Sequence, residues 1–195
     1  MTASIQVHQT PSVQYLLRVA DTCLIHSHRL SEWCGRAPVL EEDIALANMA
    51  LDMLGQARAL LTHAGTLELG SRPNATGAAF TEDQWAYLRD ERDYFNVTLV
   101  ELPSGDSPPG DFAFTVLRNH AVATWLHLLW QGLALSTDPT VAAIAAKAVK
   151  EARYHEAHTA DWVVRLGDGT DESAKRMNAA LQRLWPYTAE LLTSD

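Results

Sequence analysis

The residues best suited to chemistry are a few polar side chains within two nearly apolar segments, 41–63 and 111–135. Between Ile44 and Gly55 the polar side chains are Asn48 and Asp52, which are four residues apart. In the second segment, after Arg118 and Asn119, the polar residues are His120, Thr124, His127 and Gln131. Steps of four, three and four place such residues on one face of a helix. Both segments therefore predict helices that turn carboxylate, amide and imidazole groups toward a common interior.

Two further segments carry polar residues that could meet this set. In segment 11–34, Asp21 and His28 are seven residues apart and share a helix face. In segment 139–166, His155 falls on the apolar face, one turn after the small residue Ala152. If these helices face the first two, Asp21 or His28 would lie near Asp52, His127 and His155. The predicted buried polar network is Asp21, His28, Asn48, Asp52, His120, His127 and His155.

Three interpretations of this network compete. The favoured one is structural: the groups hydrogen-bond one another and fix the register of the helices. The second is an irregular metal site with mixed Asp and His ligands. The third is an acid–base pair without a metal, although no nucleophile stands beside it. Di-iron helical bundles use Glu-x-x-His on two helices, and no Glu or Asp here is followed three residues later by His. A conventional di-iron centre is therefore not expected.

Helical periodicity and turn residues predict an all-α chain of six helices. Short turns after the first and fourth helices predict two antiparallel hairpins, joined by a long crossover that carries a helix of its own. This is the topology of a ferritin-like four-helix bundle, here with an extra C-terminal helix. The second helix is expected to end near Gly65. One domain is expected over 1–195, with 1–10 disordered. The predicted helices are 11–34, 41–63, 81–97, 111–135, 139–166 and a last one from Thr170.

Composition narrows the range of partners and compartments. The chain of 195 residues is 47% hydrophobic and 20% charged, with a net charge of −9. This acidic balance argues against nucleic acid and anionic membranes as partners. No apolar run approaches the ~20 residues that a membrane span needs, and the N-terminus does not read as a signal peptide. Cys23 and Cys34 lie about 16 Å apart on a straight helix, too far to bridge. Reduced thiols and a cytoplasmic protein are expected.

Several segments together resemble one protein family over nearly the whole chain. They are RLSEWCG at 29–35, LEEDIALAN at 40–48, LDMLGQAR at 51–58, YLRDE at 87–91, AAKAVKEARYH at 145–155, WVVRLGDGT at 162–170 and LWPY at 184–187. The chain is similar to the C subunit of the bacterial phenylacetyl-CoA 1,2-epoxidase, also called ring 1,2-phenylacetyl-CoA monooxygenase. The family continues past the LWPY segment, so its C-terminal extension is expected to be absent here.

The resemblance implies a noncatalytic structural role. In this family, the C subunit pairs with and stabilises a related catalytic subunit, which holds a di-iron centre and receives electrons from NADPH through a reductase subunit. Small bridging and reductase subunits are further expected partners. The positions that match the catalytic subunit's ligands are Asp52, Gly55, Ala152 and His155. Gly and Ala offer no ligand atom, so the resemblance implies a vestigial centre with no cofactor in this chain.

Two other functions remain open from the sequence. The chain could be an autonomous ferritin-like di-metal oxidase with unorthodox ligands, which tight metal binding would reveal. It could also be an acyl-CoA-binding module, which CoA binding by the chain alone would reveal. No basic patch for the CoA phosphates is visible in this acidic sequence.

Overall fold

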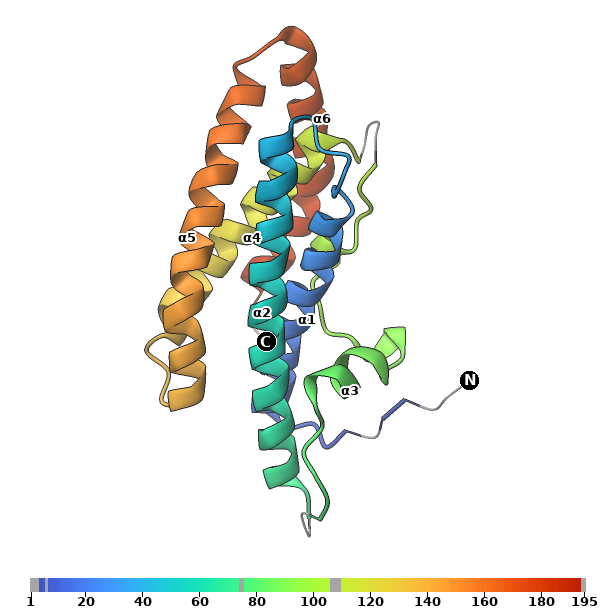
Figure 1. Ribbon diagram of the computed structural model, residues 1–195, viewed down its shortest axis with the longest axis vertical. Helices are drawn as coiled ribbons and strands as arrows, with labels where there is room; N and C mark the ends of the chain where they lie inside the picture. Colours follow the sequence, from blue (N-terminus) through green and yellow to red (C-terminus); the bar gives the residue numbers. More distant parts are fainter. Residues whose placement is uncertain (1–3, 6, 74–75, 106–109, 194–195) are drawn as a thin grey trace.

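The computed structural model describes residues 4–5, 7–73, 76–105 and 110–193, and this part of the chain is helical with no strand. Its centre consists of two antiparallel hairpins (Figure 1). The first joins α1 (Pro11–Ser31) to α2 (Leu40–Ser71), and the second joins α4 (Phe112–Leu133) to α5 (Pro139–Gly167). The predicted all-α bundle is confirmed, and its four main helices begin within two residues of the predicted positions.

The helix starts follow from local side-chain chemistry. A short polar side chain before a helix accepts hydrogen bonds from backbone N–H groups that the first turn leaves free. Asp138 does this for Thr140 and Val141 at the start of α5, where Pro139 supplies a backbone angle that suits the first turn. Among the other long helices, Thr10 caps α1, Asp111 caps α4 and Thr170 caps α6 (Asp171–Thr188).

Helix α2 runs six residues past the end predicted at Gly65, so that prediction was wrong. Gly65 serves close packing instead of ending the helix. A Cβ at this position would lie 2.1 Å from the carbonyl oxygen of Phe80 and 3.2 Å from Nε1 of Trp85. The crossover backbone therefore lies directly on α2 at this point, and only glycine leaves it room.

The crossover contains much less helix than the predicted 81–97. It has a short α3 (Glu82–Tyr87) and two 3₁₀ turns, η1 (Glu91–Asp93) and η2 (Thr98–Val100). Side chains of α1 capture its backbone donors: the N–H of Phe95 donates to Asp21, and that of Val97 donates to Thr22. Since these donors bond to another element, they are not available to a helix of their own, and tertiary contacts override the local charge pattern.

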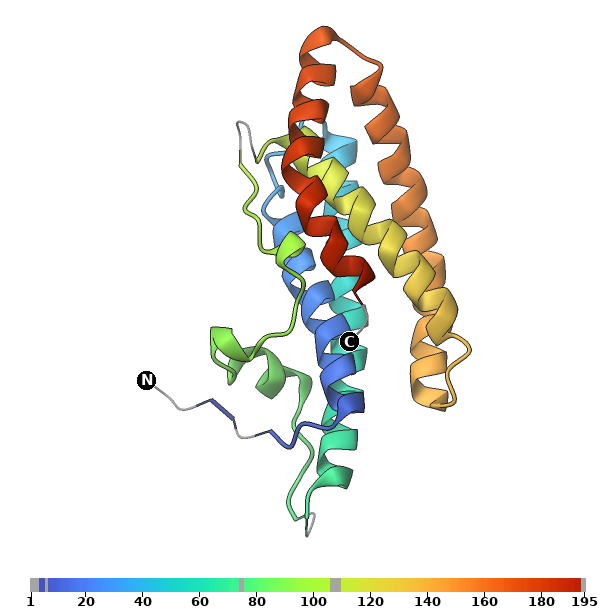
Figure 2. The same cartoon turned by 180° about the vertical axis from the view of Figure 1, so that it is seen from behind.

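The described segments nearest the two ends of the chain contact different parts of the structure. Helix α6 packs on α4 and α5 and ends in the 3₁₀ turn η3 (Ala189–Leu192), as Figure 2 shows. At the other end, the N–H of Ile5 donates to the carbonyl oxygen of Leu88, and the N–H of His8 donates to Glu68. Residues 4–5 and 7–10 thus make ordered contacts where disorder was predicted over 1–10, while 1–3 and 6 lie outside the described residues. The assignment of 1–195 to one domain stays a prediction.

The hydrophobic core runs the length of the bundle and extends under the crossover. Its largest buried side chains include Trp85, Trp130 and Phe114. A smaller cluster around Trp33 and Met49 fills the end near the α1–α2 turn. None of the helices in the described ranges is long and apolar enough to cross a membrane.

Candidate functional site

The polar residues of α4 face its hairpin partner α5. His120 Nδ1 lies 3.1 Å from Oγ1 of Thr159, and His127 Nδ1 lies 2.5 Å from Oε2 of Glu156. Both histidines are half-buried. Burial lowers the pKa of His120, against a smaller opposing effect of Glu156. The predicted face of α4 therefore exists, but it holds one hairpin together and does not reach the centre of the bundle.

Asp21 is buried, yet it faces the crossover. Arg89 donates to both of its carboxylate oxygens, from Nη1 at 2.9 Å and from Nη2 at 2.5 Å, and the N–H of Phe95 adds a third hydrogen bond at 3.0 Å. Arg89 in turn donates to the carbonyl oxygens of Trp85 and Asp93. This fully bonded ion pair accounts for Asp21 as a structural group, separate from the other predicted members.

Two predicted members are not buried at all. His28 and Asn48 are both exposed, so their place in the predicted network was wrong. His28 shares the face of α1 that carries Asp21, and the crossover covers that face at Asp21 but not at His28. Periodicity identified a common face correctly, but it could not show that this face points away from the other hairpin.

The histidine of α1 that does enter the core is His26. Its Nε2 lies 3.0 Å from Oδ1 of Asn119 on α4, whose Nδ2 lies 3.4 Å from the sulfur of Met49 on α2. Burial, helped by the charge of Arg118, lowers the pKa of His26 to about 3, so the ring is neutral. The sequence did offer a signal: His26 follows Cys23 by three residues and precedes Leu30 by four, and both of those are fully buried.

His155 and Asp52 are the predicted members that the structure joins directly. His155 Nε2 lies 3.0 Å from Oδ2 of Asp52. The His155 side chain is fully buried, whereas that of Asp52 is 40% exposed. Burial lowers the pKa of His155, although Asp52 pulls in the opposite direction. The carboxylate thus lies at the edge of the bundle and reaches in to a neutral imidazole.

This pair is one of four polar bridges between α2 and α5. We call the set the α2–α5 seam. Because the two helices are antiparallel, the residue numbers of the α5 partners decrease as those of the α2 partners increase. Three bridges pair a histidine with a carboxylate, and the fourth pairs an amide with a carboxylate. The bridges are Glu42–His158 at 3.0 Å, Asp52–His155 at 3.0 Å, Gln56–Glu151 at 3.0 Å and His63–Asp138 at 2.7 Å.

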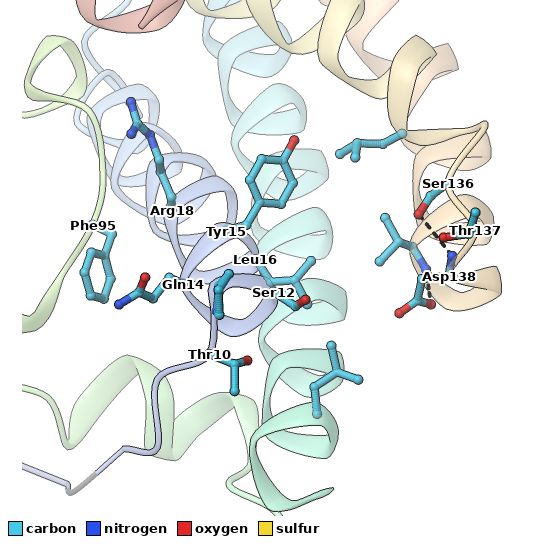
Figure 3. Close-up of a pocket in the computed structure, with 14 residues that line it drawn as sticks. Thr10, Ser12, Gln14, Tyr15, Leu16, Arg18, Phe95, Ser136, Thr137 and Asp138 are labelled. Atoms are coloured by element: carbon cyan, nitrogen blue, oxygen red, sulfur yellow. Dashed lines mark hydrogen bonds between the residues drawn. The ribbon is translucent and has the colours of Figure 1, made fainter. Parts of the chain in front are cut away.

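A groove of about 900 Å³ opens between the start of α1 and the α4–α5 turn (Figure 3). Tyr15 and Arg18 line it from α1, and Ser136, Thr137 and Asp138 line it from the turn. Arg18 and Asp138 are its charged lining residues, and Arg18 also donates to the carbonyl oxygen of Glu190. A groove with one cation on one wall and one carboxylate on the other is a poor match for the several phosphates of CoA.

Comparison with known proteins identifies the family. The family model described as phenylacetic acid catabolic protein matches residues 1–195. The chain belongs to this family. It is also 46% identical, over 181 residues, to the C subunit of 1,2-phenylacetyl-CoA epoxidase from Escherichia coli strain K12. That match covers 93% of this chain and 67% of the relative. The ferritin-like bundle predicted for this phenylacetic acid catabolic protein is thus supported by its family as well as by its helices.

A di-iron centre does not fit the residues at the expected positions. Gly55 lies exposed, with nothing within 4 Å of where a Cβ would stand, and Ala152 is a buried methyl group. Asp52 and His155 are bonded to each other, and the nearby His26 is bonded to Asn119. Among the residues that the structure describes, no group of three His, Cys, Asp or Glu could hold a metal ion.

The interior keeps two buried acceptors in place of metal ligands. Within the described part of the chain, Nδ1 of His26 and Nδ1 of His155 have no hydrogen-bond partner. An unpaired buried polar atom lowers stability. The centre of this family member is therefore a set of neutral imidazoles with hydrogen bonds to Asn119 and Asp52, and its donor set suits a structural role better than metal chemistry.

Proposed function

We propose that this protein is the noncatalytic C subunit of a multicomponent phenylacetyl-CoA epoxidase in aerobic phenylacetate degradation. It pairs with the di-iron catalytic subunit and stabilises it, and it carries no cofactor itself. The observation that carries this proposal is the pair of positions Gly55 and Ala152, which supply no ligand atom beside Asp52 and His155. The match to the E. coli C subunit supports it.

The proposal also covers further subunits, the cellular location and the classes of partner that are excluded. Small bridging and reductase subunits complete the proposed complex. A cytoplasmic location is consistent with the two free cysteines. Burial raises the pKa of Cys23 to about 12, so this thiol stays protonated and unreactive. Neither nucleic acid nor a membrane is a proposed partner, because the net charge of −9 repels both phosphate backbones and anionic lipids.

Metal content is the first test. The chain is expressed with iron and manganese supplied, and the bound metal is measured after purification. Well under one metal per chain is expected. One or two tightly held metals, lost in His155→Ala but retained in the control His158→Ala, would overturn the proposal and establish an oxidase with unorthodox ligands. His158 is a suitable control because it belongs to the same seam and bonds to Glu42 instead of Asp52.

Pairing is the second test. The catalytic subunit is expressed alone and together with this chain, and its soluble yield and thermal unfolding are compared. Co-purification and a raised unfolding temperature are expected, because a partner that binds only the folded state stabilises it. A catalytic subunit that stays equally soluble and stable without this chain would argue against a stabilising role.

A further inference from the structure

Helix α2 carries a row of large apolar side chains that point to solvent. Leu40, Ile44, Leu51 and Leu54, which we call the α2 apolar face, are between 44% and 70% exposed. Their spacing of four, seven and three residues places them along one side of the helix. At about 1.5 Å per residue the row is about 21 Å long. Single exposed leucines are ordinary, but an aligned row of this length is typical of a contact surface.

The sequence of α2 is that of a helix covered on all sides. From Ile44 to Ala57 it contains one charged residue, Asp52, and that carboxylate bonds to His155. Surface helices keep a charged or polar face toward water, and a helix that is apolar all round belongs in an interior. The side of α2 opposite its core contacts therefore has the composition of buried protein, although the described part of the chain leaves it exposed.

The neighbouring surface of α5 extends the same patch. Helices α2 and α5 lie side by side in Figure 1 and contact each other along the seam. Between them is a hollow of about 300 Å³, which Gly55 and Ala59 line from α2 and Ile144 and Ala148 line from α5. Gln56, Lys147 and Glu151 also line it, but Gln56 and Lys147 both bond to Glu151, so these polar groups are already paired. The rest of the lining is apolar and suits apolar side chains that project from a partner. Tyr154, which is exposed on α5, packs against the rings of His155 and His158 on the same side.

We propose that the α2 apolar face and the hollow beside Gly55 form the surface that docks the catalytic subunit, through an uncharged, apolar helix of that subunit. This inference rests on the proposed pairing with the catalytic subunit, and it adds the surface of this chain to which that subunit binds. A helix is the fitting element because the face is straight and about four turns long. Charge complementarity favours an apolar occupant, since the four side chains of the face offer no charge to a phosphate, a lipid headgroup or a basic peptide.

The first experiment places a charge on the proposed surface. Leu51→Glu is compared with Leu128→Glu on α4, because both leucines are 64% exposed. Helix α4 lies on the other side of the bundle (Figure 2). Binding of each variant to the catalytic subunit is measured by titration, after circular dichroism has confirmed the fold. Leu51→Glu is expected to weaken binding at least about tenfold, because a charge buried without a partner is costly, and Leu128→Glu to bind as the wild type does.

The outcomes separate the location from the pairing. Wild-type binding at full strength by Leu51→Glu overturns the location and leaves the pairing intact. No binding by the wild-type chain overturns both. Self-association of the wild-type chain that Leu51→Glu abolishes, with binding to the catalytic subunit unchanged, assigns the face to a second copy of this chain and overturns the proposal.

A second experiment needs no disruptive charge. In a Cys34→Ser background, Leu51→Cys and Leu128→Cys each present one accessible thiol, since Cys23 is buried. The rate of maleimide labelling is measured with and without the catalytic subunit. Labelling at position 51 is expected to slow at least about tenfold in the complex while labelling at 128 stays unchanged, because a buried thiol is unreachable. Equal labelling at position 51 in both states overturns the proposal.

Discussion

Helix α2 packs in two different ways on its two sides. Toward the crossover, the chain lies so close at Gly65 that a Cβ would meet the carbonyl oxygen of Phe80 at 2.1 Å. Toward α5, the corresponding glycine, Gly55, has nothing within 4 Å of its Cβ position, and a hollow opens beside it. Both sides have polar bridges, since Arg58 and Thr62 of α2 bond to Glu82 of the crossover. Close backbone packing is found at Gly65 on the crossover side, whereas the α5 side leaves a hollow beside its bridges.

The difference explains where stability is concentrated. The crossover is also joined to α1 by the buried ion pair of Asp21 and Arg89, and Arg89 lies over the ring of Tyr94, 4.2 Å from its centroid. On the α5 side, the His155–Asp52 bridge is partly open to solvent, since the Asp52 side chain is 40% exposed. Each side keeps an unpartnered buried nitrogen among the described residues, Nδ1 of His155 on the α5 side and Nε1 of Trp85 on the crossover side. The side of α2 that faces α5 is thus the more loosely packed one, and it is the side that carries the hollow beside Gly55.

The largest expected effect is on the crossover side. Arg89→Ala leaves the Asp21 carboxylate buried without its cation, and such a change costs about 3–5 kcal/mol. The free energy of unfolding, measured in urea, is expected to fall by that amount. Arg92→Ala is the matched control, since Arg92 is exposed three residues further along, and it should change stability by less than about 0.5 kcal/mol. A loss below about 1 kcal/mol in Arg89→Ala would show that Asp21 finds other partners.

The two glycines test the comparison directly. Gly65→Ala is expected to lower the free energy of unfolding by about 1–3 kcal/mol, because backbone must move to admit the methyl group. Gly55→Ala is expected to raise it by about 0.5–1 kcal/mol, because alanine is the better helix former and meets no neighbour there. Thermal or urea unfolding of both variants measures the change in the free energy of unfolding. Changes of the same sign in Gly65→Ala and Gly55→Ala would contradict the contrast between the two sides of α2.

Acid should weaken the α5 side before the crossover side. Burial lowers the pKa of His26 to about 3 and also lowers that of His155. Below about pH 6.5, these two histidines therefore bind protons more readily in the unfolded chain than in the folded chain. Stability is therefore full above the unfolded pKa and falls as the pH drops through 6.5 toward the folded pKa. Between pH 7 and 5, His26 should lower the free energy of unfolding by about 2 kcal/mol, and His155 should act in the same direction.

A variant isolates this contribution. His26→Gln is expected to flatten the fall in unfolding free energy between pH 7 and 5, whereas His28→Gln, at an exposed position on the same helix, should leave the slope unchanged. The window stays above the range in which most carboxylates take up protons. An identical pH slope in His26→Gln and the wild type would show that this ring is protonated in the folded chain.

The sequence was most informative where local chemistry decides the structure. Helix starts at Thr10, Asp111 and Asp138 follow from capping residues, and each of these side chains caps its helix in the structure. The crossover could not be predicted in the same way. Its charged run indicated one helix over 81–97, but Asp21 and Thr22 of α1 take its backbone donors, and that contact joins residues more than 70 positions apart.

The polar site shows the same limit. Helical spacing grouped Asp21 with His28 and placed both toward the other hairpin, yet that face lies under the crossover or in solvent. His26 lies instead on the face of α1 that carries the buried residues Cys23 and Leu30, and this face, not that of Asp21 and His28, points into the bundle. His155 and Asp52 do bond to each other. His155 could be placed from the apolar face of α5, and Asp52 is the one charged residue between Ile44 and Ala57.

The smallest effect expected is at the seam itself. Asp52→Ala removes the acceptor of a buried imidazole, but the carboxylate is 40% exposed, so water can replace part of what is lost. A loss of about 1 kcal/mol in unfolding free energy is expected, at the low end for an unpaired buried group. Asn48→Ala, one turn earlier and exposed, is the control and should be neutral. If Asp52→Ala costs as much as Arg89→Ala, the contact of α5 with α2 contributes as much stability as the contact of the crossover with α1, and the contrast between the crossover and the seam fails. If it costs nothing, His155 is held by packing alone, and the seam contributes to partner binding rather than to the fold.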